Sequence, residues 1–280
     1  MVDSLVNSSA QLWNWKYWDG KPFLTCHLLP QPHGFFTRQF YPLTPERLVN
    51  ALSPSADVFR VKQVHGKEVL LPTDVTAHMT AVQLRLAQSK APASGDLVQS
   101  LPFADGVMSD RLNQSVWACS ADCTPALICD LVTRQVAAIH AGWRGTAKKI
   151  LPAAISQMVA QGSQMKNLRV ALGPAIEGSV YQVSEAVACE VGATVAPAIA
   201  GNTLIERLLE IENPPFLSDL EEGKIRLDVR RINQMQMTQM GLSIEQVAIA
   251  PHCTYQDAEN FFSYRRTQEK KVQWAGIVSQ

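Results

Sequence analysis

The sequence has no excess of charge of either sign, because 25 Lys and Arg residues balance 25 Asp and Glu residues among 280. Non-specific nucleic-acid binding needs a basic excess, so no nucleic-acid partner is expected, although a local cationic pocket stays possible. No segment reaches the ~20 mostly apolar residues of a membrane-spanning helix, and the start lacks the pattern of a secretory signal. We therefore expect no membrane partner and a cytoplasmic location.

Cysteine is also scarce, with six residues in the chain. Disulfide scaffolds belong to short secreted proteins, so reduced thiols are expected here. The apolar surroundings of Cys119 and Cys129 predict inert, buried side chains. Hydrophobic residues make up 46% of the chain and charged residues 18%, which allows a sizeable core and excludes a disordered chain.

Short apolar runs alternate with helical patterns along the chain. Buried strands are predicted at 115–121, 125–130, 135–140, 168–172 and 246–250. Ser184 and Asp228 are expected to cap two helices, the second of which ends at Gly241. Another helix is predicted from Thr146, as its N-cap, to Gly162, with a kink or division at Pro152. This alternation predicts an α/β fold, and the short strand-to-strand connections predict mixed sheets.

Two segments in the first part of the chain, residues 1–30 and 72–104, differ in composition and in predicted structure. Residues 1–30 are rich in Trp and Tyr and are expected to contribute early strands. Residues 72–104 have weak periodicity, and Pro, Gly, Ser and Ala dominate positions 88–95. We interpret this second segment as an insertion made of a helix and an exposed loop. The length of the chain allows either two domains or one large α/β domain.

Three potential metal ligands adjoin Gly or polar residues at the ends of apolar runs: His65, Cys123 and His140. Strand ends and strand-to-helix turns are where α/β proteins place ligands. One Cys and two His could bind Zn²⁺ and leave the fourth tetrahedral position open. Spacing alone is a weak signal, because neither HExxH nor CxxC is present. The alternatives are a small buried Cys and ordinary core or surface His residues.

Six motifs make the sequence recognisable. It contains, in this order, QVHG, ADGVMSD, SADCTPALICD, AAIHAGWRGTAKKI, ALGPAIEGSVYQV and CTYQDAENFFSYRR. Together they resemble the YfiH family, also called the multicopper polyphenol oxidase or laccase-like family. The resemblance implies zinc held by His65, Cys123 and His140. It also implies a single domain over residues 1–280, in which two mixed β-sheets pack together with helices outside, in α/β/β/α layers.

Two segments depart from the family pattern. After FFSYRR the family continues with a Gly-containing turn and a Gly-Arg pair, whereas residues 267–274 of this chain read TQEKKVQW. The family's tail contacts are therefore not carried over. The segment 72–104 is longer than the family's usual connection, and it could shape a lid or a partner surface.

The resemblance implies phosphorolysis of purine nucleosides, namely adenosine, inosine, guanosine or methylthioadenosine, with some adenosine deamination. The expected partners are then a nucleoside and phosphate. An open zinc position could orient phosphate or lower the pKa of a bound water. Arg144, beside a predicted helix N-terminus, is the first candidate to bind phosphate, and Arg265 is the next.

Further site residues are expected around the metal ligands. Trp143 and Tyr264 could stack on the purine, or they could pack in the core. Asp122 and Asp105 could act as acid or base, could contact substrate, or could orient the ligands. The usual zinc deaminase signature is absent, so any deamination must use another arrangement.

Other functions remain open. Laccase chemistry needs a copper cluster held by many imidazoles, and this chain has only six histidines, so copper is expected at most in the zinc-like site. Cys123 as nucleophile and His140 as base would instead make a hydrolase, a chemistry that could edit peptidoglycan precursors. A non-enzymatic protein with structural zinc is a third alternative, but three ligands suit it poorly. A monomer or weak homodimer is expected.

Overall fold

Two mixed six-stranded sheets form the centre of the computed structural model, which describes residues 12–88 and 100–280. The first sheet runs β1 (Trp13–Trp18), β2 (Lys21–Cys26), β3 (His33–Phe36), β15 (Gln273–Val278), β7 (Gln114–Ser120) and β4 (Asp57–Phe59). The second runs β14 (Val247–Ile249), β10 (Leu168–Leu172), β8 (Thr124–Asp130), β9 (Val136–Ala141), β6 (Gly106–Met108) and β5 (Val69–Leu70). The pairs β4–β7, β5–β6 and β10–β14 are parallel and the others antiparallel, as predicted for mixed sheets.

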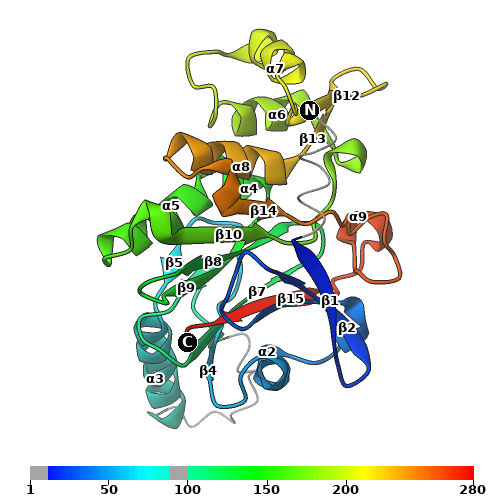
Figure 1. Cartoon of the computed structure of the whole chain (residues 1–280). Helices are drawn as coiled ribbons and strands as arrows, with labels where there is room; N and C mark the ends of the chain where they lie inside the picture. The colour runs from blue at the N-terminus through cyan, green and yellow to red at the C-terminus, as the bar shows by residue number, and fades with distance from the viewer. Residues whose placement is uncertain (1–11, 89–99) are drawn as a thin grey trace.

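Helices and short 3-10 turns surround these sheets (Figure 1). The α-helices are α2 (Pro45–Leu48), α3 (Pro72–Gln88), α4 (Trp143–Ala147), α5 (Ile150–Ala160), α6 (Glu185–Gly192), α7 (Gly201–Glu210), α8 (Val229–Gln239) and α9 (Tyr264–Thr267). The 3-10 turns are η1 (Arg38–Phe40), η2 (Val49–Ala51), η4 (Met165–Asn167), η5 (Gly178–Val180) and η6 (Ile244–Gln246). No helix of the described residues is long and apolar enough to cross a membrane.

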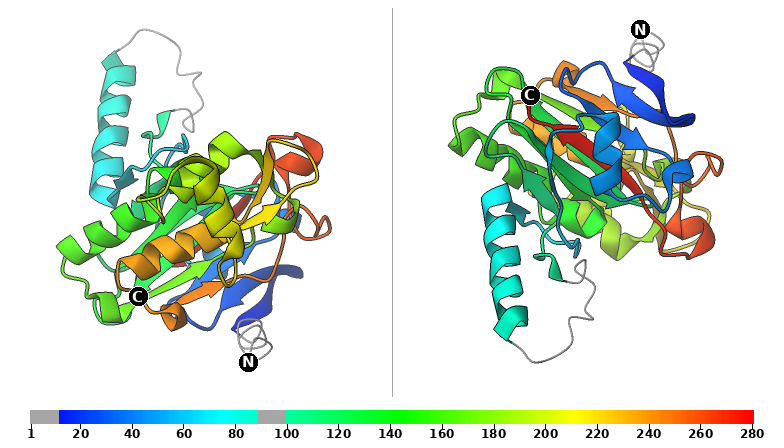
Figure 2. Two further views of the ribbon diagram at one scale, coloured as in Figure 1. Left: turned by 90° about the horizontal axis from the view of Figure 1, so that it is seen from above. Right: turned by 90° about the horizontal axis from the view of Figure 1, so that it is seen from below.

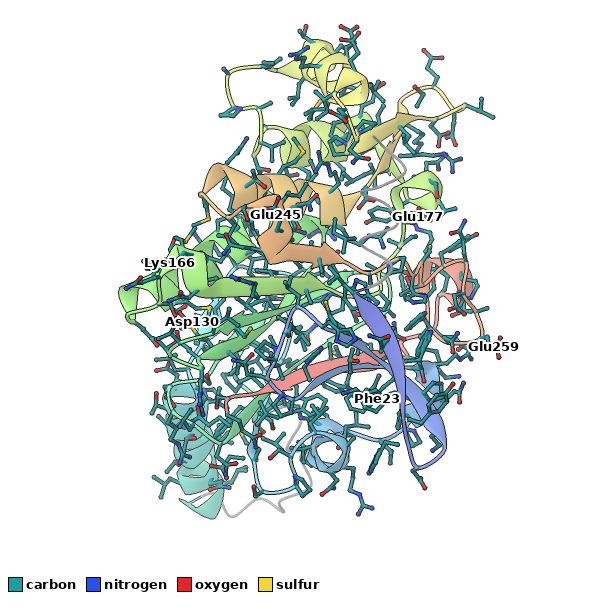
Figure 3. All side chains as sticks on the ribbon, viewed as in Figure 1. Phe23, Asp130, Lys166, Glu177, Glu245 and Glu259 are labelled. Atoms are coloured by element: carbon teal, nitrogen blue, oxygen red, sulfur yellow. The ribbon has the colours of Figure 1, made fainter. Side chains whose placement is uncertain are left out.

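The layers follow from the period-two alternation of buried side chains along the strands. On β8, Leu127 faces the core between the two sheets, where it joins Val116 of the first sheet. Its neighbour Ile128 faces the other way and packs with Ile155 of α5 and Met237 of α8. On the far side of the first sheet, Trp117 and Phe36 pack with Leu48 of α2. The order is therefore helices, sheet, sheet, helix, which confirms the predicted α/β/β/α layers. Figure 3 shows the side chains that fill them, with Lys166 and Glu259 exposed at opposite edges.

A third sheet was not predicted. It has three short antiparallel strands in the order β11 (Gln182–Ser184), β13 (Lys224–Leu227) and β12 (Phe216–Ser218). Its own core joins Phe216 and Leu227 to Leu204 of α7 and Ile232 of α8. This small sheet, with α6 and α7, lies above α8 in Figure 1.

Most predicted elements are present, and the main correction concerns the helix predicted from Thr146. Asp228 and Ser184 cap α8 and α6 by accepting hydrogen bonds from backbone N–H groups, as expected. Thr146, however, is not a cap: it lies inside α4, and its hydroxyl hydrogen-bonds with Asn233 of α8. The chain breaks instead at Lys149, whose φ of 59° lies in the left-handed region.

The helix predicted over 146–162 is divided, as expected, because α4 ends at Ala147 and α5 begins at Ile150. The break lies just before Pro152 rather than at this residue. Pro152 itself lies in the first turn of α5, where a backbone N–H has no partner inside the helix, so proline costs nothing there. The end of α5 is as expected, because Gly162 has a φ of 105° and Ser163 donates a backbone hydrogen bond to Met158.

The segment 72–104 begins with the expected helix, α3, which projects from the body of the fold in both views of Figure 2. The loop predicted at 88–95 lies outside the described residues from position 89 onwards. That the segment is an insertion into one domain stays a prediction.

Candidate metal centre and cavity

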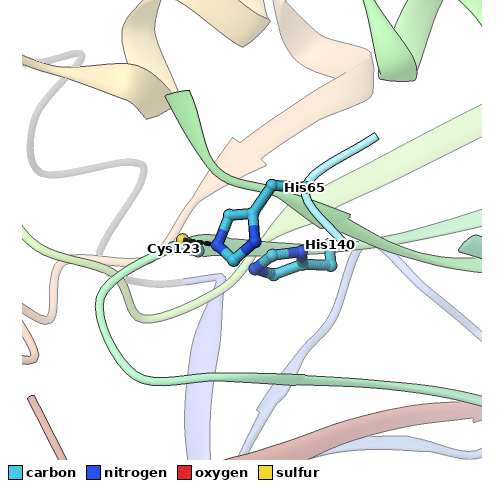
Figure 4. A group of neighbouring side chains, drawn as sticks. All are labelled: His65, Cys123 and His140. Carbon is cyan, nitrogen blue, oxygen red and sulfur yellow. Dashed lines mark hydrogen bonds between the residues drawn. The ribbon is translucent and has the colours of Figure 1, made fainter. Parts of the chain in front are cut away.

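The three predicted metal ligands meet at one end of the second sheet. Their ligand atoms all lie within 4.8 Å of one another, and the Cys123 Sγ is 3.9 Å from His65 Nε2 (Figure 4). Strand register explains the meeting of two of them. Thr124 pairs with Ala141, so Cys123, just before β8, lies beside Gly142, which follows the strand that carries His140.

Gly142 is required here because of space rather than backbone conformation. A Cβ atom added to it would lie 2.7 Å from Cys123 Sγ and 3.3 Å from the His65 ring. Its φ of −72° is open to any residue. Any larger side chain would therefore push the ligands apart.

His65 is positioned by Asp105, whose carboxylate is fully buried. The carboxylate accepts hydrogen bonds from the backbone N–H groups of Val64, His65 and Gly66, at 2.5–3.2 Å. These bonds hold His65 at a left-handed φ of 58°. Asp105 Oδ1 also lies 2.9 Å from His140 Nδ1, so one side chain orients both imidazoles.

The pair of Cys123 and His140 is electrostatically coupled. Burial would raise the pKa of the Cys123 thiol, but His140 and His65 outweigh it and lower that pKa to about 6. Burial would likewise lower the pKa of His140, but Cys123 and Asp105 raise it. The site therefore favours a thiolate, the form that binds metal.

The donor set fits zinc. It offers one thiolate and two imidazole nitrogens, which are the ligands of three-ligand zinc sites with an open position. Elsewhere in residues 12–88 and 100–280, no second group of three or more His, Cys, Asp or Glu side chains comes together in this way. All six histidines are among these residues, so the many-imidazole cluster of a laccase has no counterpart in the described chain.

A cavity of about 680 Å³ opens on these ligands. The predicted residues Asp122, Trp143, Arg144, Tyr264 and Arg265 all line it. Arg144 lies in the first turn of α4 with its guanidinium 4.3 Å from the Trp143 ring centre. It forms no ion pair or side-chain hydrogen bond with the residues that the structure describes, so its charge is available to a ligand.

The structure narrows the roles that the sequence left open for the two predicted aspartates. Asp105 does not line the cavity, which favours its orienting role over substrate contact. Asp122 lines the cavity at a φ of 102°, but its two oxygens already accept hydrogen bonds from the Thr254 hydroxyl and the Arg265 backbone N–H. Its carboxylate thus ties the cavity wall to the start of α9.

Several cavity residues were missed. Tyr181 was not singled out, although it lies in the motif ALGPAIEGSVYQV. The divergent tail, residues 268–272, also forms part of the wall and brings Lys270 and Lys271 to it. Cys119 lines the cavity rather than the core, but burial raises its pKa to about 12, which keeps it unreactive. Cys129 is fully buried, as predicted.

Comparisons with known proteins bear on the family and the fold of the chain. The family described as multi-copper polyphenol oxidoreductase laccase matches residues 44–279. A Synechocystis protein named purine nucleoside phosphorylase is 51% identical over 272 residues, which are 96% of this chain and 97% of that protein. A protein of an unknown prokaryote named adenosine deaminase RL5 is 30% identical over 147 residues, 52% of this chain and 51% of its own. YlmD from Geobacillus stearothermophilus has the same fold, with a TM-score of 0.72 at 20% identity over 94% of this chain and 98% of that one.

Proposed function

The chain belongs to the multi-copper polyphenol oxidoreductase laccase family, the YfiH family of the motif resemblance, and we propose that it is a metal-dependent purine nucleoside phosphorylase. The observation that carries this proposal is the joint position of the His65–Cys123–His140 group and the unpaired Arg144 on one cavity. The name of the Synechocystis relative supports the reaction.

His65, Cys123 and His140 would hold the metal, and zinc is the ion that their donors suit best. A bound zinc ion would supply Lewis-acid polarisation of an oxygen ligand. Copper could occupy the same donors, because Cu²⁺ binds such ligands more tightly than Zn²⁺.

The chain's own residues account for the rest of the reaction. Arg144 would bind phosphate through its guanidinium fork. A phosphate oxygen forms a bond to C1′ of the ribose while the bond from C1′ to the purine nitrogen breaks, and the purine takes the electron pair together with the proton that hydrogen phosphate loses. The positive charge that develops on the sugar is stabilised by the adjacent phosphate. Tyr264, an exposed ring in the cavity wall, offers a face for the purine, and Trp143 offers the part of its ring that Arg144 does not cover.

Adenosine, inosine, guanosine and methylthioadenosine are the proposed substrates. Adenosine deamination by the same site is a further part of the proposal, supported by the name of the RL5 relative. The test incubates metal-loaded protein with this nucleoside panel, with and without phosphate, and identifies the products. Free purine and ribose 1-phosphate that appear only with phosphate support the phosphorylase, and their absence with every nucleoside overturns it.

Arg144→Lys should raise the KM for phosphate by roughly 10- to 100-fold, the effect of losing a charged hydrogen bond. Lysine lacks the two-pronged donor geometry of arginine, which explains the higher KM. Because lysine keeps the positive charge and Arg144 is not a metal ligand, the metal content and the fold should not change. The measurement is steady-state phosphorolysis at varied phosphate. Arg134→Lys, an exposed arginine outside this cavity, is the control and should leave the KM unchanged. An unaltered phosphate KM in zinc-loaded Arg144→Lys would exclude Arg144 from phosphate binding.

A second candidate function follows from the low pKa of the Cys123 thiol. A thiolate beside a protonated His140 is also the arrangement of a Cys–His hydrolase, which could act on peptidoglycan precursors. The two functions differ in what the thiolate contacts. A nucleophile must be free to react, whereas a metal ligand is covered by its metal.

Iodoacetamide should therefore alkylate Cys123 in metal-free protein with a midpoint near pH 6, and zinc should suppress the reaction. The thiolate predominates above its pKa of about 6, and the rate should fall as the pH is lowered through that value. Burial raises the pKa of Cys26, Cys119 and Cys129 to about 11, 12 and 12, so they should not react at pH 7. Peptide mass mapping identifies the alkylated residue, with Cys123→Ser as the control. Alkylation undiminished by saturating zinc would favour the hydrolase.

A further inference from the structure

Tyr181 is a cavity residue to which no role has been given above. Its ring packs against the core of the third sheet, and its backbone is fixed on both sides. The Tyr181 N–H donates to Gly178, and the Tyr181 carbonyl accepts from the N–H of Leu227 on β13. The phenol therefore enters the cavity from a rigid support, as a preorganised binding group does.

Arg265 covers this ring. The Arg265 guanidinium carbon lies 4.7 Å from the centre of the Tyr181 ring, and Arg265 Nη1 donates a 2.9 Å hydrogen bond to the carbonyl of Gln182. The Arg265 backbone N–H is bound in turn to Asp122 Oδ2 at 2.7 Å. Because both the side chain and the backbone of Arg265 are held by hydrogen bonds, its cation–π contact leaves the Tyr181 ring little freedom to move.

The Tyr181 hydroxyl, in contrast, has no hydrogen-bond partner among the described residues. It lies within the electrostatic influence of Cys123, Asp122, Arg144 and Arg265, which are all residues of the cavity wall. The Tyr181 hydroxyl is not among the buried polar atoms that lack a partner, so it reaches the open cavity, where a ligand can take the place of water and accept its hydrogen bond. Burial and the charge of Cys123 raise the pKa of this phenol to about 12, so it keeps its proton at neutral pH.

We propose that the Tyr181 hydroxyl donates a hydrogen bond to the nucleoside, and that Arg265 is a positioning residue that holds the Tyr181 ring. The inference rests on the proposed function for the identity of the ligand. A neutral donor suits the uncharged oxygen and nitrogen acceptors of a nucleoside, whereas phosphate is better bound by the charged and unpaired Arg144. Arg265, already bound to Gln182 and Tyr181, is less available to phosphate.

The test uses full-length, zinc-loaded protein and two readouts, calorimetric binding of adenosine without phosphate and phosphorolysis at varied adenosine and varied phosphate. Tyr181→Phe should weaken adenosine binding and raise the adenosine KM by about five- to tenfold, as for one lost hydrogen bond, and leave the phosphate KM unchanged. Tyr17→Phe, which removes a hydroxyl from an exposed tyrosine of β1, is the control and should change neither.

Equal adenosine affinity in Tyr181→Phe and the unaltered protein would overturn the proposal, and so would a rise in the phosphate KM alone. An unaltered protein that binds no adenosine would overturn it too. If adenosine binds but no ribose 1-phosphate forms, the phosphorylase proposal fails, and the binding comparison still decides the role of Tyr181.

A double-mutant cycle tests the role of Arg265. If Arg265 acts through Tyr181, then Arg265→Met should weaken adenosine binding in the unaltered protein and add little in Tyr181→Phe. Equal effects in both backgrounds, or a raised phosphate KM, would show that Arg265 contacts substrate directly and would overturn its positioning role.

Discussion

Cys123→Ser should lose most of its bound metal, and its phosphorolysis should fall by on the order of 100-fold or more. The Cys123 Sγ is the one sulfur in the group whose ligand atoms lie within 4.8 Å of one another. A serine hydroxyl at the same place ionises far less readily than the thiol, whose pKa is lowered to about 6, and so it is a poor metal ligand. The measurement is elemental analysis of zinc and copper per chain, followed by kinetics with adenosine and phosphate.

Cys189→Ser is the matched control, because Cys189 lies on α6 and does not line the cavity. It should keep the full metal content and the full rate. A fully loaded Cys123→Ser protein would show that Cys123 is not a ligand. If that protein kept its metal and lost only activity, the nucleophilic role of Cys123 would be favoured instead.

The strands that carry the site were predictable because they are buried on both faces. The runs that form β8, β9 and β10 are almost wholly apolar. Short runs of this kind are typical of strands in the interior of a sheet that is covered on both faces. The caps of α6 and α8 were predictable for a local reason: Ser184 and Asp228 satisfy N–H groups within the next turn.

The failures come from contacts between distant segments. Thr146 has the sequence character of a cap, but its hydroxyl is used by Asn233, 87 residues away, and α4 continues through it. The third sheet was missed because its strands have only three or four residues, too few to show a period-two pattern.

The candidate site divides in the same way. His65, Cys123 and His140 could be named from their motifs, but the contacts that bring them together could not. Strand register places Cys123 near His140, and the Asp105 carboxylate holds the turn that carries His65. Tyr181 also lies in one of the motifs, ALGPAIEGSVYQV, but it is not a metal-ligand type, and an isolated tyrosine after a turn is compatible with many surface positions. Asp105 was named, but substrate contact and ligand orientation could be separated only by its burial and by the direction of its hydrogen bonds.

Asp105→Asn should lower the free energy of unfolding of the metal-free protein by about 3 kcal/mol and weaken metal affinity by roughly 10- to 100-fold. The buried carboxylate accepts from three consecutive backbone N–H groups and faces His140 Nδ1. An asparagine keeps one side-chain oxygen, which can still accept from the His65 N–H and face His140 Nδ1 as Oδ1 does now. Its amide NH₂ must then face an N–H donor, most directly that of Gly66, which leaves a buried donor unsatisfied.

Urea unfolding of the metal-free protein and zinc titration with a competing chelator measure the two effects of Asp105→Asn separately, because bound metal would otherwise add to the apparent stability. Asp57→Asn is the control: Asp57 pairs with Arg111 on the surface, where both side chains are more than half exposed, so its loss should cost within about 0.5 kcal/mol. The lowered pKa of Asp105 also makes the stability of the protein depend on pH. A carboxyl group whose pKa is lower in the folded protein stabilises the fold at pH values above the pKa of the unfolded chain, and this stability is lost as the pH falls through the folded pKa. An asparagine side chain cannot titrate, so the Asp105→Asn variant should lose less stability than the unaltered protein on acidification. A parallel fall in both proteins would show that Asp105 does not hold the His65 turn and His140 through its charge.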